Sequence, residues 1–316
     1  MILLRQRLFS KNKKKKEEEK DSNRDLKIGA GALVAGDVAN TILHRRNTRK
    51  MNENTEKVIK LAENSELAKK MIEEAKKQGT KSGTPSGIVR ESILEEAKKQ
   101  LGKDYTPSFL DELTIAQEAE RGGREIRKHM GGSPAVYFKG LDTIVTEAEP
   151  DKSSAATLAH ELGHAKNFKE TGGSKLGRLA HKIGSTPTTQ KLGALGSLGV
   201  GFASGYKAEE KKEKGEKVST LNKLTPAIAA AALAAPALIR EGAATRQGIK
   251  DLKKLGASDE YIKATKKELG RAFGTYVHGI GGSYAVSGYT GRLAGRGVRR
   301  LQHKREEALR KYAEED

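Results

Sequence analysis

Cysteine and tryptophan are absent from this 316-residue chain, and aromatic residues make up only 4% of it. Without cysteine, the chain can form no disulfide, no thiol nucleophile and no thiolate zinc site. Any zinc must therefore be bound by histidine and carboxylate side chains. The lack of cysteine also fits a reducing compartment, and the basic stretches carry no aromatic platform on which nucleic-acid bases could stack.

Hydrophobic residues are also few, at 35% against 32% charged residues. Such a composition predicts a packed helical part beside solvated portions. Residues 1–25 combine a block of lysines with a block of glutamates, which is typical of a basic disordered tail. No secretory apolar core with a small-residue cleavage site is apparent at the start, so we expect a membrane-associated or cytoplasmic protein that is not secreted.

Acidic residues are outnumbered, because 60 Lys and Arg face 41 Asp and Glu, for a formal charge of +19. This excess favours an anionic partner such as a membrane surface, an acidic protein or nucleic acid. No recognised nucleic-acid-binding motif accompanies the charge, so an anionic membrane surface is preferred over nucleic acid. The sequence leaves the oligomeric state open.

Long hydrophobic runs are missing too. Four stretches lack Lys, Arg and Glu but are rich in glycine and alanine: residues 28–43, 192–206, 224–239 and 272–291. The second and third are shorter than the roughly 20 apolar residues of a spanning helix. They can be tightly packed soluble helices or Gly-rich loops. They can equally be membrane helices, because small residues allow close helix contact and the basic flank at 207–217 suits lipid headgroups.

The order of elements can be predicted from local patterns. Runs of β-type residues at 135–138 and 143–145 indicate a hairpin or an edge strand. A helix from about residue 153 to 170 follows them. Later helices are expected from Thr225 to about Leu255 and from Ser258 towards Val277.

The segment His160-Glu161-Leu162-Gly163-His164 has the HExxH pattern. On a helix, His160 and His164 share one face, one turn apart, which suits two tetrahedral zinc ligands. Glu161 lies beside the first histidine and can act as general base on an attacking water. The alternative is an ordinary helix with solvated or core histidines, but the β-type runs before it and the carboxylates after it favour a metal site.

A catalytic zinc needs a third protein ligand. Glu170 stands six residues after His164, where the three-histidine class of zinc sites has its third histidine. We therefore expect a glutamate on a second helix to complete the site. Glu241 is preferred because it follows an apolar segment within a strong predicted helix. Glu209 and Glu210 are rivals in a Lys/Glu run that looks solvent-exposed.

These residues resemble a known family. The resemblance lies in three segments: TLAHELGHAKN (157–167), LIREGAATRQGIKDLKKLG (238–256) and LGRAFGTYVHGI (269–280). Together they are similar to the YugP-like neutral zinc metallopeptidases of bacteria, over about residues 135–280. The resemblance implies membrane association, zinc bound by His160, His164 and Glu241, and Glu161 as the catalytic base.

The HtpX-like membrane peptidases have the same arrangement of zinc ligands but carry an aspartate four residues after the third ligand. Thr245 stands there in this chain, which leaves open what orients the metal ligands. The reaction also needs an electrophilic group for the oxyanion of the tetrahedral intermediate. Arg246, Tyr276 and His278 are the candidates.

The predicted fold class is mainly α, with a zincin-like helical core and a short β hairpin or edge strand before the zinc helix. A flexible linker or a domain boundary is expected at 79–87, because GTKSGTPSG is rich in turn formers. Four regions result: a basic tail (1–25), a helical N-terminal region with the linker (26–87), a zincin-like metallopeptidase domain (88–280) and a basic C-terminal tail or helix (281–316).

The sequence thus predicts a zinc-dependent endopeptidase that acts on peptides or proteins, with Zn²⁺ as cofactor. One rival is a basic structural or interaction protein that binds membrane or nucleic acid and keeps a vestigial zinc helix. Another is a soluble zincin that regulates repressors by cleavage. It is disfavoured because no Glu-containing helix closely follows the HELGH segment.

Overall fold

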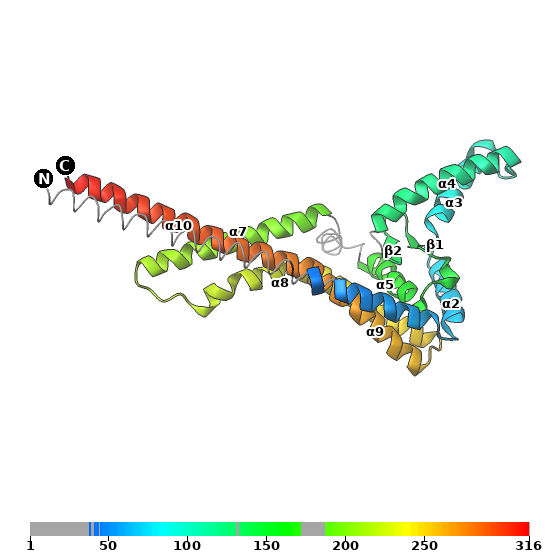
Figure 1. Ribbon diagram of the computed structural model, residues 1–316. Coiled ribbons are helices and arrows are strands. Elements are labelled where there is room, and N and C mark those ends of the chain that lie inside the picture. The colour runs from blue at the N-terminus through cyan, green and yellow to red at the C-terminus, as the bar shows by residue number, and fades with distance from the viewer. Residues whose placement is uncertain (1–37, 39–40, 44, 131–132, 172–186, 316) are drawn as a thin grey trace. The chain divides into compact units, whose positions relative to one another are not determined.

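The computed structural model describes residues 38, 41–43, 45–130, 133–171 and 187–315 (Figure 1). This part of the chain is mainly helical and has one three-stranded sheet, which confirms a mainly α fold with short strands. The predicted tail over 1–25 lies outside the described residues.

Contacts divide the chain into two compact units, each built from separate stretches of sequence. Residues 46–185 and 236–276 form one, called the sheet unit, and residues 1–45, 186–235 and 277–316 form the other, called the helical unit. The predicted regions were contiguous and do not coincide with this division. Helix α8 (Thr220–Lys254) contributes residues to both units, and it begins five residues before the predicted start at Thr225.

The sheet unit places a small sheet among helices (Figure 1). Residues 46–59 are helical. The further elements are α2 (Asn64–Lys77), β1 (Lys81–Gly83), α3 (Pro85–Leu101), α4 (Phe109–Met130), β2 (Ala135–Phe138), β3 (Thr143–Thr146), η1 (Pro150–Lys152), α5 (Ala155–Thr171), residues 236–254 of α8, and α9 (Asp259–Tyr276).

The strands lie in the order β1-β3-β2, with β1 parallel and β2 antiparallel to β3. The prediction of a flexible linker at 79–87 was wrong, because these residues include β1 and the start of α3. Gly79 ends α2 with a φ of 71°, and the hydroxyl of Thr84 caps α3 by accepting from the Gly87 amide at 3.2 Å. The turn-forming residues therefore act as helix ends on either side of a short strand.

The core of the sheet unit surrounds α5. Its buried side chains include Leu67, Met71, Leu158, Leu252 and Tyr261. Asn64 fixes the start of α5, since its side chain accepts from the Ala155 amide and donates to the Ser153 carbonyl, both at 3.0 Å. The Tyr261 hydroxyl donates to the same Asn64 side chain at 2.6 Å. One buried amide thus joins α2, α5 and α9.

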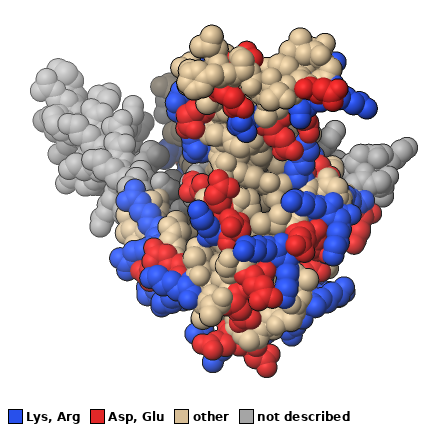
Figure 2. Space-filling model, turned by 90° about the vertical axis from the view of Figure 1, so that its right-hand side faces the viewer, with Lys and Arg blue, Asp and Glu red and all other residues tan. Residues whose placement is uncertain are grey.

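The surface over α2, α3 and α4 carries both signs of charge, as Figure 2 shows. Blue and red side chains alternate on this face. The ion pairs of these elements include Arg90 with Glu112 at 2.7 Å and Lys81 with Glu95 at 2.7 Å. The face shows no continuous basic patch of the kind that follows a nucleic-acid backbone.

The helical unit contains α7 (Pro187–Glu213), residues 220–235 of α8, η2 (Val277–Gly282) and α10 (Ser283–Glu315). Helices α7 and α10 run parallel in close contact, because Gly201 lies against Gly288 and Gly205 lies against Arg292. Within the described part of the chain, α8 is the one helix long and apolar enough to cross a membrane, with a mean hydropathy of 1.4 in its best window.

Candidate metal centre

Helix α5 brings the two motif histidines together as their spacing predicts. The Nε2 atoms of His160 and His164 lie 3.1 Å apart, and the ring planes are nearly perpendicular at 86°. His160 is only 6% exposed, and the His164 side chain is 14% exposed. Each imidazole therefore directs its Nε2 atom at the same point beside the helix.

Glu241 reaches this point from α8, 77 residues further along the chain. Its Oε2 lies 3.2 Å from Nε2 of His164 and 3.4 Å from Nε2 of His160, and the residue is 4% exposed. His160, His164 and Glu241 thus form a group that can hold a metal ion, with their donor atoms all within 4.8 Å of one another.

The donor set fits a small tetrahedral ion. Ligand distances of about 2.0–2.1 Å in a tetrahedral zinc site correspond to donors about 3.3–3.4 Å apart. The observed separations of 3.1, 3.2 and 3.4 Å fall close to that value. Two imidazoles and a carboxylate are also donors that zinc accepts, and a three-residue set leaves an open position for a reacting molecule.

Glycines let α5 and α8 approach closely enough for Glu241 to reach the histidines. A Cβ atom added at Gly163 would lie 2.4 Å from the Ala244 carbonyl oxygen. A Cβ added at Gly248 would lie 2.7 Å from the backbone of Ala159. Gly163 of the motif therefore makes room for the second helix.

Thr245 takes up a supporting position behind the first ligand. Its Oγ1 lies 3.1 Å from Nδ1 of His160, the ring nitrogen that points away from the other donors. A hydroxyl in this place fixes the orientation of the imidazole, as the outer partners of metal-bound histidines do. The threonine that departs from the HtpX-like pattern therefore contacts the ligand itself.

Glu268 is a second buried carboxylate near His160. It accepts hydrogen bonds from Thr157 at 2.8 Å, Thr55 at 3.0 Å and Ser154 at 3.1 Å. Burial raises the pKa of this carboxyl, although the three hydroxyls and the charge of His160 oppose the shift. The sequence patterns gave no sign of Glu268, because its partners come from two distant segments, at residue 55 and at residues 154–157.

Glu161 lies beside the donor group and is 7% exposed. Its Oε2 accepts a hydrogen bond of 2.7 Å from the backbone amide of Tyr137 in strand β2. Burial raises the pKa of Glu161, with the imidazoles of His164 and His160 opposing the shift. The expected β element before the helix thus positions the expected base, through a backbone group that sequence analysis did not identify.

Among the three oxyanion candidates, Tyr276 at the end of α9 lies near the site. Burial, followed by the charges of Glu241 and Glu161, raises the pKa of its hydroxyl. Arg246 is exposed, and His278 belongs to the helical unit. Arg240 was not anticipated, yet its Nη2 lies 3.5 Å from Oε1 of Glu241.

The rival ligands Glu209 and Glu210 lie on α7 in the helical unit. Glu209 pairs with Arg300 at 2.6 Å, and Glu210 pairs with Lys214 at 2.8 Å. Each rival carboxylate therefore already has a basic partner.

Comparison of the chain with protein-family models, curated proteins and solved structures gives no match.

Proposed function

We propose that this protein is a zinc-dependent peptidase. The convergence of His160, His164 and Glu241 on one point, with Glu161 beside them, is the observation that carries the proposal. A divalent metal bound there supplies Lewis acidity and makes water acidic enough to react near neutral pH. The likeness of the motif regions to the YugP-like metallopeptidases supports the same activity.

Glu161 acts as the proton carrier in this proposal. The Tyr137 amide holds its Oε2, which leaves Oε1 to face a water molecule or the substrate. Glu161 takes a proton from the attacking water and passes it to the amine that leaves when the peptide bond breaks.

Tyr276 supplies a hydrogen bond to the developing oxyanion. Its raised pKa keeps the phenol protonated at neutral pH, so that it can donate. A donor placed where negative charge develops stabilises the transition state more than the ground state.

We also propose that the peptidase works at a membrane. The length and hydropathy of α8 support this location, as does the formal charge of +19, which favours an anionic surface.

The function is tested by metal analysis together with cleavage of an unstructured protein such as casein. The wild type should bind about one zinc per chain. His160→Ala and Glu241→Ala should lose the metal, whereas Glu161→Gln should keep it and lose activity by roughly 100-fold or more. Glu210→Ala is the matched control, because it removes the rival glutamate and should keep both metal and activity.

A chain without stoichiometric zinc, or one whose cleavage is unaffected by chelation, contradicts the proposal. Zinc binding without cleavage of any substrate, together with lipid or nucleic-acid binding that persists in Glu161→Gln, would instead support a basic interaction protein with a vestigial zinc helix.

A further inference from the structure

The helical unit buries small and polar residues. Among its described residues, no leucine, isoleucine, valine or phenylalanine is buried. The buried positions are Ser197, Gly201, Ser204, Gly205, Ala208, Glu209, Pro226, Ala230, Ala234, Tyr284, Gly288, Gly291, Arg292 and Gly295. At Gly201, Gly205, Gly291 and Gly295 an added Cβ would lie within about 2 Å of a backbone oxygen of the opposite helix.

Large apolar side chains of the same unit point outwards instead. Leu195 is 62% exposed on α7, and Leu221 is 68% exposed on α8. Further exposed members on the three helices are Leu192, Leu198, Val200, Leu224, Ile228, Tyr289, Leu293 and Val298. The interior of the sheet unit differs, since it buries leucine, isoleucine, methionine and tyrosine around α5. An apolar surface over a small-residue interior is suited to lipid as the surrounding solvent.

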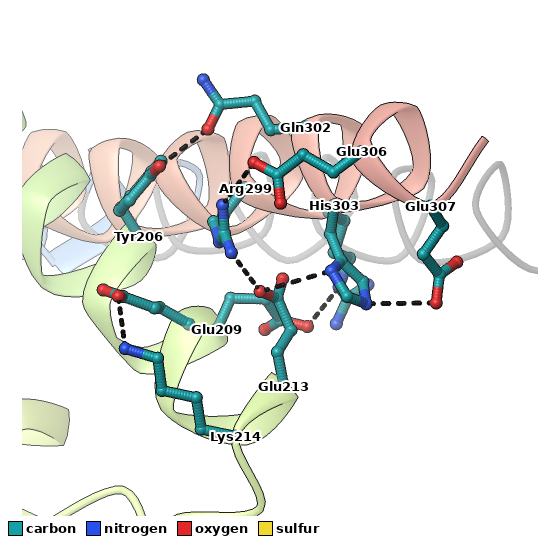
Figure 3. A network of polar contacts seen from close by, with 11 residues as sticks. Tyr206, Glu209, Glu213, Lys214, Arg299, Gln302, His303, Glu306 and Glu307 are labelled. Carbon is teal, nitrogen blue, oxygen red and sulfur yellow. Dashed lines mark hydrogen bonds and ion pairs between the residues drawn. The ribbon is translucent and has the colours of Figure 1, made fainter. Parts of the chain in front are cut away.

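At the charged end of this unit, two arginines of α10 pair with acidic residues of α7. Figure 3 shows Arg299 of α10 facing Glu213 of α7, at 2.7 Å, with His303 close to the same carboxylate. Arg300 pairs with Glu209 at 2.6 Å. Acidic residues of α7 thus balance the arginines of α10 at this level.

Two arginines nearer the apolar surface have no such balance. Arg292 is 5% exposed, and among the described residues it donates to neutral groups alone, namely the Ser204 hydroxyl and the backbone and side-chain oxygens of Asn222. Arg296 follows one turn later on the same face, and its Nε is buried without a hydrogen-bond partner in the described part of the chain. Two adjacent guanidinium groups in apolar surroundings need a negative counter-charge.

We propose that the helical unit inserts into a lipid bilayer, and that Arg296, beside the buried charge of Arg292, binds the phosphate of an anionic phospholipid at its boundary. Guanidinium groups match phosphate oxygens in geometry and charge. A lipid supplies the anion and the alkyl chains together, as the neighbouring Leu293 and exposed α7 leucines require. A second copy of the chain would add the same positive charges. The inference deepens the proposed membrane location and is independent of the metal chemistry.

The test is flotation of the full chain with vesicles of phosphatidylcholine alone and with added phosphatidylglycerol. Wild type should prefer the anionic vesicles, and Arg296→Gln should lose roughly tenfold in partitioning to them. Arg305→Gln removes the same charge from an exposed position of α10 and should lose about fivefold or less, as for a non-specific surface charge. Equal losses in both variants would overturn the headgroup site.

A second pair of variants tests the apolar surface. Leu195→Gln should weaken binding to both vesicle types, whereas Leu101→Gln, which changes a 67% exposed leucine of the sheet unit, should not. Wild type that floats with neither vesicle, or that self-associates through Leu195 in their absence, overturns the proposal. Binding of free inorganic phosphate through Arg296 without binding of vesicles would also overturn the proposal. Unchanged helix content and zinc content in each variant show that the fold and the proposed peptidase site are intact.

Discussion

At the scale of single residues, the contacts of the His160 ring should determine how tightly the candidate site binds a metal ion. Thr245 is the nearest group behind this ring, with 3.1 Å between Oγ1 and Nδ1. Its hydroxyl keeps Nε2 directed at Glu241 and His164 without adding a charge.

Thr245→Val should therefore lower zinc affinity by roughly 10- to 100-fold, the usual effect of losing an outer partner. Thr245→Ser, which keeps the hydroxyl, should stay close to wild type. Competition with a chromogenic chelator measures both. Equal affinities for wild type and Thr245→Val would show that the hydroxyl does not hold the ring.

Glu268 should make the folded protein less stable as pH rises, which is the opposite of the usual effect of a carboxyl group. Its folded-state pKa is raised, so the folded protein binds its proton more tightly than the unfolded chain does. In metal-free protein, this contribution to the free energy of unfolding is lost as pH rises from about 4.3, the unfolded pKa, through the raised folded value.

Relative to Glu268→Gln, wild type should thus gain stability as pH falls through this window. The gain is about 1.4 kcal/mol for each unit between the two pKa values. Urea unfolding at several pH values with a chelator present measures it. The exposed Glu260→Gln on the same helix should show no such trend, and a trend of opposite sign for Glu268→Gln would refute the assignment.

At the scale of elements, the sequence predicts best where periodicity and motif coincide. Helix α5 was expected at about 153–170 and lies at Ala155–Thr171. Helix α9 was expected from Ser258 towards Val277 and lies at Asp259–Tyr276. Strand β1 was missed because three residues between two helix ends carry no periodic signal, and its pairing with β3 is long-range. Likewise, the capping of α5 by Asn64 depends on a contact across about ninety residues.

The crossing of α5 and α8 gives a test of how the site is built. Gly163→Ala places a Cβ against the Ala244 carbonyl and should cost about 1–3 kcal/mol in the free energy of unfolding, with loss of zinc binding. Gly242→Ala is the matched control, because the nearest atom to its new Cβ is 4.0 Å away on Phe273. It should be neutral or stabilise the helix by about 0.5–1 kcal/mol. Denaturant unfolding and metal analysis report both.

At the scale of the whole molecule, the sequence suggested contiguous regions, whereas each compact unit is assembled from separated stretches. The metallopeptidase region predicted at 88–280 includes α7, which belongs to the helical unit, and omits α2, which packs on α5. Local composition reports solvation and turn propensity, but it does not report which distant segments share a core. The sequence nevertheless pointed to the three side chains that the structure brings together, because metal chemistry restricts residue type and spacing more strongly than packing does.

The proposed metal also joins distant parts of the sheet unit, because α5 and α8 supply its ligands. Saturating zinc should therefore raise the unfolding temperature, because zinc at one hundred times its dissociation constant adds about 2.7 kcal/mol to the free energy of unfolding. Differential scanning fluorimetry with zinc and with chelator measures the shift. His164→Ala should abolish it, and a shift that persists in this variant would place the stabilising metal elsewhere.

The backbone contact at Gly163 and Gly248 has a consequence for which ion the protein accepts. Neither helix can retreat without losing that contact, so the gap between imidazoles and carboxylate is set by the framework. Calcium, which takes about six to eight oxygens at about 2.3–2.6 Å, finds two nitrogens and too narrow a cage. We therefore expect the candidate site to favour a small ion over calcium, because Gly163 and Gly248, which carry no side chain, set the spacing of its donors.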